Sequence, residues 1–163
     1  MTSLFDPIHV GNLHLPNRVV MAPLTRNRAG EGQVPRDIAV EYYAQRASTG
    51  LIISEGTQPS AVGQGYLNTP GLHTDEQRDG WAAVADAVHA KGGHIFVQLM
   101  HAGRIGHPDN KPAKEIVAPS AIAAPDTMVT PSGSQPFPTP RALETDEVAA
   151  VVDVFVHLSL IHI

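Results

Sequence analysis

The chain has 163 residues, a formal net charge of −5 and no cysteine. The length indicates one domain and is short for a complete (β/α)8 barrel, which needs about 250 residues. No basic cluster indicates a nucleic-acid partner, no apolar run approaches the roughly 18 residues of a membrane span, and the lack of cysteine excludes disulfides and thiolate catalysis. We therefore expect a cytoplasmic protein without signal peptide or membrane segment that binds no nucleic acid.

The N-terminal part is predicted to form a hairpin and a strand. Apolar residues alternate over 5–16 around the turn dipeptide of Gly11 and Asn12, which predicts a small β-hairpin. The apolar run at 18–22 predicts a buried strand. Residues 23–36 contain glycine and proline and are expected to form a loop.

A helix, a second strand and a second loop are expected next. Apolar residues at helical spacing predict a helix over 37–48, which Gly50 would end. The apolar run at 51–55 predicts another buried strand. Residues 56–73 are rich in glycine and proline and are expected to form a loop.

The following helix has both start and stop signals. Thr74 and Gln77 form a capping-box pattern, in which the threonine hydroxyl accepts from the amide three residues on and the glutamine side chain reaches back. Lys91, followed by two glycines, is a stop signal. Residues 94–99 are then predicted as the third strand.

The C-terminal part is dominated by a proline-rich segment. Residues 100–142 hold eight of the fourteen prolines and are predicted as a long ordered loop over the edge of the sheet where the strands end. Thr145, Asp146 and Glu147 predict the start of a last helix, because acidic residues favour the first turn. No fourth strand is recognisable after this helix, so a barrel built on this pattern is expected to be truncated.

Each of the three predicted strands runs directly into a polar turn. Thr25 follows the first, Glu55 and Gly56 follow the second, and Gln98 follows the third. Short apolar runs separated by helices are typical of an α/β protein with a buried parallel sheet. In such folds the functional residues gather at the carboxyl ends of the strands.

These strand ends resemble those of the Old Yellow Enzyme family. The motifs that resemble the family's first three strand ends are MAPLTR (21–26), SEGT (54–57) and VQLMHAGR (97–104). Further matching motifs are LFDP (4–7), LPNR (15–18), PGLH (70–73) and PRAL (140–143), the last resembling the N-ethylmaleimide reductase branch. The resemblance implies the N-terminal part of a (β/α)8 TIM barrel, with about three βα units and an N-terminal hairpin. Residues 1–157 are expected to form this part, and residues 158–163 are expected to be a non-matching tail.

The family resemblance implies an FMN-dependent oxidoreductase that takes hydride from NADPH or NADH and reduces the activated C=C bond of a small enone. In the family, a His-Asn or His-His pair holds the substrate carbonyl and a tyrosine just after it donates the proton. Both lie after the matched region, so no catalytic residue is expected in this chain. The oligomeric state is left open.

The resemblance also implies which residues contact the flavin. Thr25 offers a hydroxyl donor, and Gln98 offers both an amide donor and an acceptor for the flavin edge. Gly56 allows the backbone to approach the ring closely. Pro23 has no N–H, so its carbonyl and the neighbouring amides, including that of Leu24, are expected to make the contact.

Two further positions are expected to line the substrate pocket. Tyr66 matches a pocket tyrosine of the branch. Met100 stands where many relatives have tryptophan, and its flexible side chain is expected to reshape the pocket.

Simpler interpretations exist for several of these residues. Thr25 could satisfy a turn, and Gln98 could be a polar cap at a strand end. Glu55 is expected to pair with an arginine rather than to act as an acid. His101 and Arg104 are interpreted as loop-shaping residues, and no histidine has the spacing of a metal site.

Two alternative functions remain at this stage. The chain could be a non-catalytic barrel fragment that self-associates or aggregates, because open strand edges pair with other chains. A phosphate-binding barrel enzyme such as an aldolase would need a Schiff-base lysine. The three lysines all lie in predicted loops or helix ends: Lys91, Lys111 and Lys114.

Overall fold

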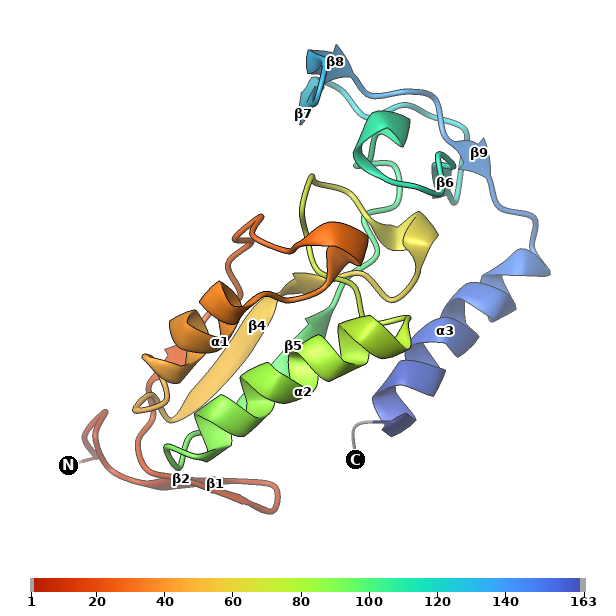
Figure 1. The fold of residues 1–163 in the computed structure, drawn as a ribbon. Coiled ribbons are helices and arrows are strands. Elements are labelled where there is room, and N and C mark those ends of the chain that lie inside the picture. Colours follow the sequence, from red (N-terminus) through yellow and green to blue (C-terminus); the bar gives the residue numbers. More distant parts are fainter. Residues whose placement is uncertain (1, 162–163) are drawn as a thin grey trace.

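The computed structural model describes residues 2–161 and is built around a three-stranded parallel sheet with the strand order β3-β4-β5 (Figure 1). The strands are β3 (Val20–Met21), β4 (Leu51–Thr57) and β5 (Ile95–Leu99). Ile52 pairs with Met21 on one side and with Ile95 on the other. The three predicted strands and their parallel arrangement are therefore confirmed, with a shorter β3 and a longer β4 than expected. The predicted burial of the first strand is wrong, because β3 is an outer strand of this sheet and Val20 is 51% exposed.

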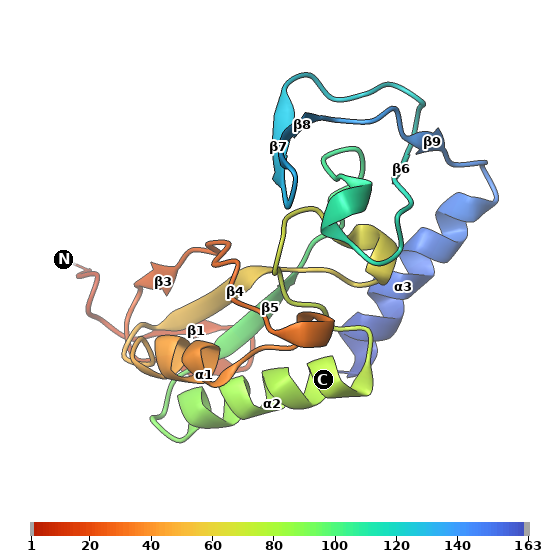
Figure 2. The ribbon, with the colours of Figure 1, turned by 45° about the horizontal axis from the view of Figure 1, so that its top comes forward.

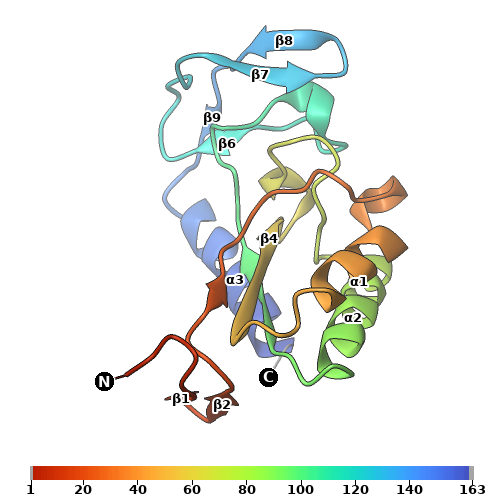
Figure 3. The same ribbon diagram turned by 90° about the vertical axis from the view of Figure 1, so that its left-hand side faces the viewer.

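Two helices cover one face of this sheet, and the core lies between the layers (Figures 1 and 3). They are α1 (Asp37–Ala44) and α2 (Asp75–His89). Trp81 and Val84 of α2 pack with Ile52 of β4 in a single buried cluster, in which Ile52 and Val84 are fully inaccessible. Burial of apolar side chains in this layer provides the main stabilisation of the fold.

The N-terminal hairpin is formed by β1 (Ile8–Val10) and β2 (Leu13–Leu15), as the sequence predicts. Gly11 adopts a φ of 56°, which explains the glycine in the turn. Figure 3 shows the hairpin beyond the amino-terminal end of β4, away from the edge where the strands end.

Helix α1 ends earlier than the predicted range of 37–48. After Ala44 the chain continues in tight turns, in which the amide of Arg46 donates to the Tyr43 carbonyl and the amide of Thr49 donates to the Arg46 carbonyl. Apolar residues continue at helical spacing through these turns, and this explains why the predicted helix is longer than α1.

The Thr74 half of the capping box predicted at the start of α2 is confirmed, whereas the Gln77 side chain reaches one residue further back than the box requires. The Thr74 hydroxyl accepts from the amide of Gln77 at 3.3 Å, and the Gln77 side chain reaches back to the amide of His73 at 2.8 Å. The Gln77 amide group also donates to the Gly32 carbonyl at 2.8 Å. This side chain therefore joins the loops that follow β3 and β4.

The prediction that residues 100–142 form one long loop is wrong. The segment contains the 3-10 helix η3 (Pro108–Asn110) and four short strands, which are β6 (Val117–Ala118), β7 (Thr127–Thr130), β8 (Gly133–Pro136) and β9 (Arg141–Ala142). Most of its prolines flank these strands, so the proline content hides the alternating burial of β7. Figure 2 shows the segment beyond the carboxyl ends of β4 and β5, so its expected position is confirmed.

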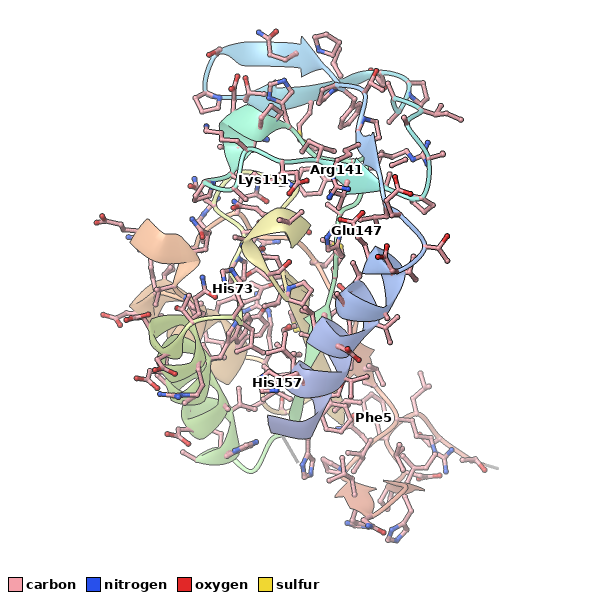
Figure 4. The ribbon with its side chains drawn as sticks, turned by 90° about the vertical axis from the view of Figure 1, so that its right-hand side faces the viewer. Phe5, His73, Lys111, Arg141, Glu147 and His157 are labelled. Atoms are coloured by element: carbon pink, nitrogen blue, oxygen red, sulfur yellow. The ribbon has the colours of Figure 1, made fainter. Side chains whose placement is uncertain are left out.

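The last helix is α3 (Glu147–Ile161), which begins after the predicted Thr145. Arg141 bonds the Glu147 carboxylate at 2.7 and 2.9 Å and Glu115 at 2.8 Å, which joins the helix start to the β6–β9 segment (Figure 4). Of the predicted tail, residues 158–161 continue α3 and Leu158 is buried in the core, whereas residues 162–163 lie outside the described residues. Within residues 2–161, no helix has the length and apolarity needed to cross a membrane.

The position of Ile52 at the centre of the core leads to a stability prediction. We expect Ile52→Ala to lower the free energy of unfolding by about 2–5 kcal/mol, because the substitution removes buried methyl groups and leaves a cavity. Ile122→Ala is the matched control, because Ile122 is 64% exposed. Urea denaturation followed by circular dichroism measures both variants, and equal losses in the two would contradict the assignment of the core.

Candidate functional site

The carboxyl ends of the three parallel strands meet at one edge of the sheet. Gly56 of β4 lies opposite Gln98 of β5. The loop after β3 turns back against β4, because the backbone amide of Arg26 donates to the Glu55 carboxylate at 2.9 Å (Figure 3). Thr25, Gly56 and Gln98, which come from three separate segments, are thereby brought to the same edge. We call the predicted flavin contacts Pro23, Leu24, Thr25, Gly56 and Gln98 the strand-end cluster.

A bulge in β4 fixes the backbone beside Gln98. The pairing register with β5 shifts between Ile53 and Gly56. Within this bulge the Ser54 hydroxyl donates to the Glu55 carbonyl at 2.9 Å and accepts from the Gln98 amide at 3.1 Å. Ser54 is fully buried and is therefore a positioning residue for Gln98; the sequence signal that could have identified it is a serine directly after the apolar run of β4.

The polar groups of the strand-end cluster are available for a ligand. Pro23, Leu24 and Thr25 are exposed, and Gln98 is partly buried. Within residues 2–161, neither the Thr25 hydroxyl nor the Gln98 carboxamide takes part in a hydrogen bond, although the Gln98 backbone does. Hydrogen-bond donors and an acceptor of this kind fit the polar edge of a flavin ring.

Gly56 and Met100 lie against one another. A β-carbon at Gly56 would stand 2.6 Å from Met100 Cε and 2.9 Å from its Sδ. The amide of Met100 donates to the Thr57 carbonyl at 2.9 Å, which holds the start of its side chain next to β4. The space above Gly56 is thus filled by a flexible thioether, which can move aside more easily than a branched or aromatic side chain.

Glu55 is a buried carboxylate beside the cluster. It is 3% exposed, and burial raises the pKa of its carboxyl group, although the amide of Arg26 and the nearby guanidinium groups act in the opposite direction. The predicted ion pair with an arginine is wrong: among the described residues, no arginine guanidinium nitrogen lies within 4.0 Å of the Glu55 carboxylate, and the Arg26 guanidinium lies 5.0 Å from the Tyr42 ring centre. The amide of Glu55 donates to the Tyr43 hydroxyl at 2.9 Å, and burial raises the pKa of that phenol.

The loop that contains Tyr66 reaches the same region. The amide of Ala102 donates to the Gly63 carbonyl at 2.9 Å, so this loop is bonded to the segment that follows Met100. The Tyr66 side chain is 42% exposed, while its carbonyl accepts from Gln64 and from Thr69, each at 3.1 Å. The backbone at Tyr66 is therefore fixed and its ring remains accessible.

The interpretation of His101 and Arg104 as loop-shaping residues is confirmed. The His101 Nδ1 atom accepts from the amide of Gly103 at 3.0 Å, and burial together with the Lys111 charge lowers the pKa of its ring. Arg104 donates to the Ile122 carbonyl at 2.8 Å and to the Ser120 hydroxyl at 2.9 Å. In the described part of the chain, no three histidine, aspartate or glutamate side chains are placed to hold a metal ion.

Comparison with known proteins identifies the family. The model of the NADH:flavin oxidoreductase / NADH oxidase family matches residues 3–159. The chain belongs to this family. Old Yellow Enzyme homologues are among its relatives, so the resemblance seen in the strand-end motifs is confirmed, and so is the fold as part of a TIM barrel.

Similar proteins include enzymes from fungi, protozoa and bacteria. The chain is 46% identical over 155 residues to chanoclavine-I aldehyde reductase of Penicillium roqueforti and 40% identical over 158 residues to a probable flavin mononucleotide-dependent alkene reductase of Leishmania infantum. These matches include 92–93% of this chain but only 40–43% of the length of the two relatives.

Solved structures of similar proteins also match this chain over only part of their length. The fold matches morphinone reductase in complex with tetrahydroNAD with a TM-score of 0.89 and 47% identity, over 97% of this chain and 45% of the other. It matches the Old Yellow Enzyme homologue of Zymomonas mobilis with a TM-score of 0.90 and 46% identity, over 94% and 43% of the two chains. The chain therefore spans less than half of each of these structures.

The buried carboxylate at Glu55 leads to a prediction about pH. The folded chain binds the Glu55 proton more tightly than the unfolded chain does, because burial raises the folded pKa above the usual 4.5. Glu55 is therefore expected to lower the free energy of unfolding as the pH rises from about 4.5 through the raised pKa. Glu55→Gln keeps an acceptor for the Arg26 amide but has no such proton.

We expect Glu55→Gln to gain stability relative to the wild type over this pH range. Glu31→Gln, at an exposed position, is the control and should follow the wild type. Urea unfolding at a series of pH values measures the difference. A stability difference that does not change with pH in Glu55→Gln would contradict the raised pKa.

Proposed function

We propose that the protein to which this chain belongs is an FMN-dependent oxidoreductase that reduces the activated C=C bond of a small enone, with NADPH or NADH as the electron source. FMN, when bound, would supply hydride transfer to the β-carbon of the enone. The observation that supports this best is the convergence of three strand ends that leaves the Thr25 hydroxyl and the Gln98 carboxamide free at one edge. The lack of cysteine favours the cytoplasm as its compartment.

Within this proposal the strand-end cluster holds the flavin edge. Thr25 donates a hydrogen bond, and Gln98 donates and accepts. Gly56 presents backbone without a side chain of its own, and Pro23 and Leu24 contribute a carbonyl and an amide. Such contacts orient the cofactor and adjust its electronic properties, since the hydride chemistry belongs to the cofactor itself.

Tyr66 and Met100 are proposed to line the substrate side of the same site. Tyr66 offers an accessible phenol on a fixed backbone, and Met100 offers an adaptable apolar surface above Gly56. We assign no catalytic residue to this chain. We therefore expect the isolated chain to have no appreciable enone turnover, even if it binds FMN.

The proposal predicts a specific loss of FMN affinity. Gln98→Ala is expected to weaken FMN binding about tenfold, because it removes hydrogen bonds worth about 0.5–1.5 kcal/mol each. Gln45→Ala, on the exposed turn after α1, is the matched control and should bind like the wild type. Titration followed by quenching of flavin fluorescence measures the three dissociation constants. Equal affinities for wild type and Gln98→Ala would contradict the role of Gln98.

A second candidate function is self-association of a non-catalytic fragment. In the described part of the chain, β3 and β5 are the outer strands of the sheet, and Val20 and Phe96 are 51% and 50% exposed. Unpaired strand edges with exposed apolar side chains favour pairing with another chain. Size-exclusion chromatography with light scattering separates the two candidates: a yellow monomer supports flavin binding, and a colourless dimer or aggregate supports self-association.

A further inference from the structure

Buried polar side chains surround the loop that contains Tyr66. Their exposed fractions lie between 2% and 5%. The residues are Gln58, Gln64, Thr69, Asn110 and Lys111. Each of them donates a hydrogen bond to a backbone carbonyl of residues 62–69. This loop is therefore held by specific donors rather than by apolar packing alone.

Two of these donors come from the distant segment around η3. The Lys111 ammonium donates to the Val62 carbonyl at 2.5 Å (Figure 4). The Asn110 side chain donates to the Gly65 carbonyl at 3.3 Å and to the Val129 carbonyl in β7 at 3.0 Å. These adjacent residues connect the loop of β4 to the hairpin of β7 and β8.

Stability alone gives a weak reason for burying an ammonium group here. Removing a charge from water is costly, and buried charges can often be replaced by apolar groups without loss of stability. The titratable groups near Lys111 are His101 and Glu115. Burial lowers the pKa of the lysine to about 8, although the Glu115 charge acts in the opposite direction. A buried lysine ammonium group that bonds a single loop carbonyl is better explained by a role in positioning that loop.

We propose that Asn110 and Lys111 are positioning residues that hold the loop 58–69 so that the Tyr66 ring is presented to the substrate. This inference rests on the proposed role of Tyr66 in the substrate pocket. The loop backbone is otherwise constrained by Thr69 and Gln64, which both bond the Tyr66 carbonyl, and Asn68 adopts a left-handed φ of 52°. Fixing a backbone while leaving its aromatic side chain accessible is the arrangement that preorganised binding sites use.

Hydrogen exchange of the loop tests the proposal. Lys111→Met keeps the length of the side chain and removes the donor, and Asn110→Ala removes the bonds to Gly65 and Val129. Lys114→Met removes the same charge from an exposed side chain of the same segment and is the control. We expect peptides covering 58–69 to exchange about tenfold faster in the first two variants, with α2 and β4 unchanged, and to be unaffected in the control.

The tyrosine itself provides a second readout. The chain has three tyrosines, so 3-fluorotyrosine labelling gives three fluorine resonances, and Tyr66→Phe assigns one of them. The Tyr66 resonance should shift or broaden in Lys111→Met and Asn110→Ala, while those of Tyr42 and Tyr43 stay in place. Unchanged loop exchange, or faster exchange throughout the chain in both variants, would overturn the proposal.

The pH dependence of the free energy of unfolding tests the burial of the Lys111 charge separately from the role of Asn110. Because the pKa of Lys111 is lowered in the folded chain from 10.5 to about 8, the unfolded chain binds more protons between these values, and the free energy of unfolding should rise with pH there. This rise should be absent in Lys111→Met and present in Lys114→Met. An identical rise in both variants would contradict the burial of the Lys111 charge. None of these three readouts depends on FMN, so a failure here is distinguishable from a failure of flavin binding.

Discussion

The parallel pairing of β4 with β3 on one side and β5 on the other is the constraint on which the rest of the structure depends. It is maintained by burial of Ile52 beneath α2, and it brings the ends of three segments to one edge of the sheet. Thr25, Gly56 and Gln98 are far apart in the sequence and become neighbours only through this pairing. The candidate site is therefore a consequence of the strand order.

Polar groups behind the edge determine how the site residues are presented. Ser54 and Glu55 both follow the apolar part of β4 and are buried, and their hydrogen bonds go to the backbone of Gln98 and Arg26. The first bond fixes the strand next to the free Gln98 carboxamide, and the second holds the loop that contains Thr25. In the loop that contains Tyr66, Lys111 and Asn110 likewise bond backbone carbonyls and hold the loop in place. Buried donors and acceptors thus orient residues whose own side chains remain free for a ligand.

Much of this arrangement follows from the sequence. Alternating apolar residues located the hairpin, short continuous apolar runs located the three strands, and helical spacing together with capping signals located the helices. The strand-end motifs led to the family, which the match over residues 3–159 confirms. The strands within 100–142 were missed, since each is short and flanked by proline. The roles of Ser54 and Lys111 and the backbone partner of Glu55 depend on contacts between distant segments, which local patterns do not encode. The roles of the strand-end cluster, Tyr66 and Met100 remain predictions.

The central claim is that Thr25, Gly56 and Gln98 form one surface for a flavin ring. The most direct measurement is a titration of the isotopically labelled chain with FMN, followed by the backbone amide resonances of these residues. The account predicts that the amides of Thr25, Gly56 and Gln98 shift together and saturate at the same FMN concentration, while those of the β1–β2 hairpin stay unchanged. Saturable shifts confined to other parts of the chain, or none at all, would contradict it.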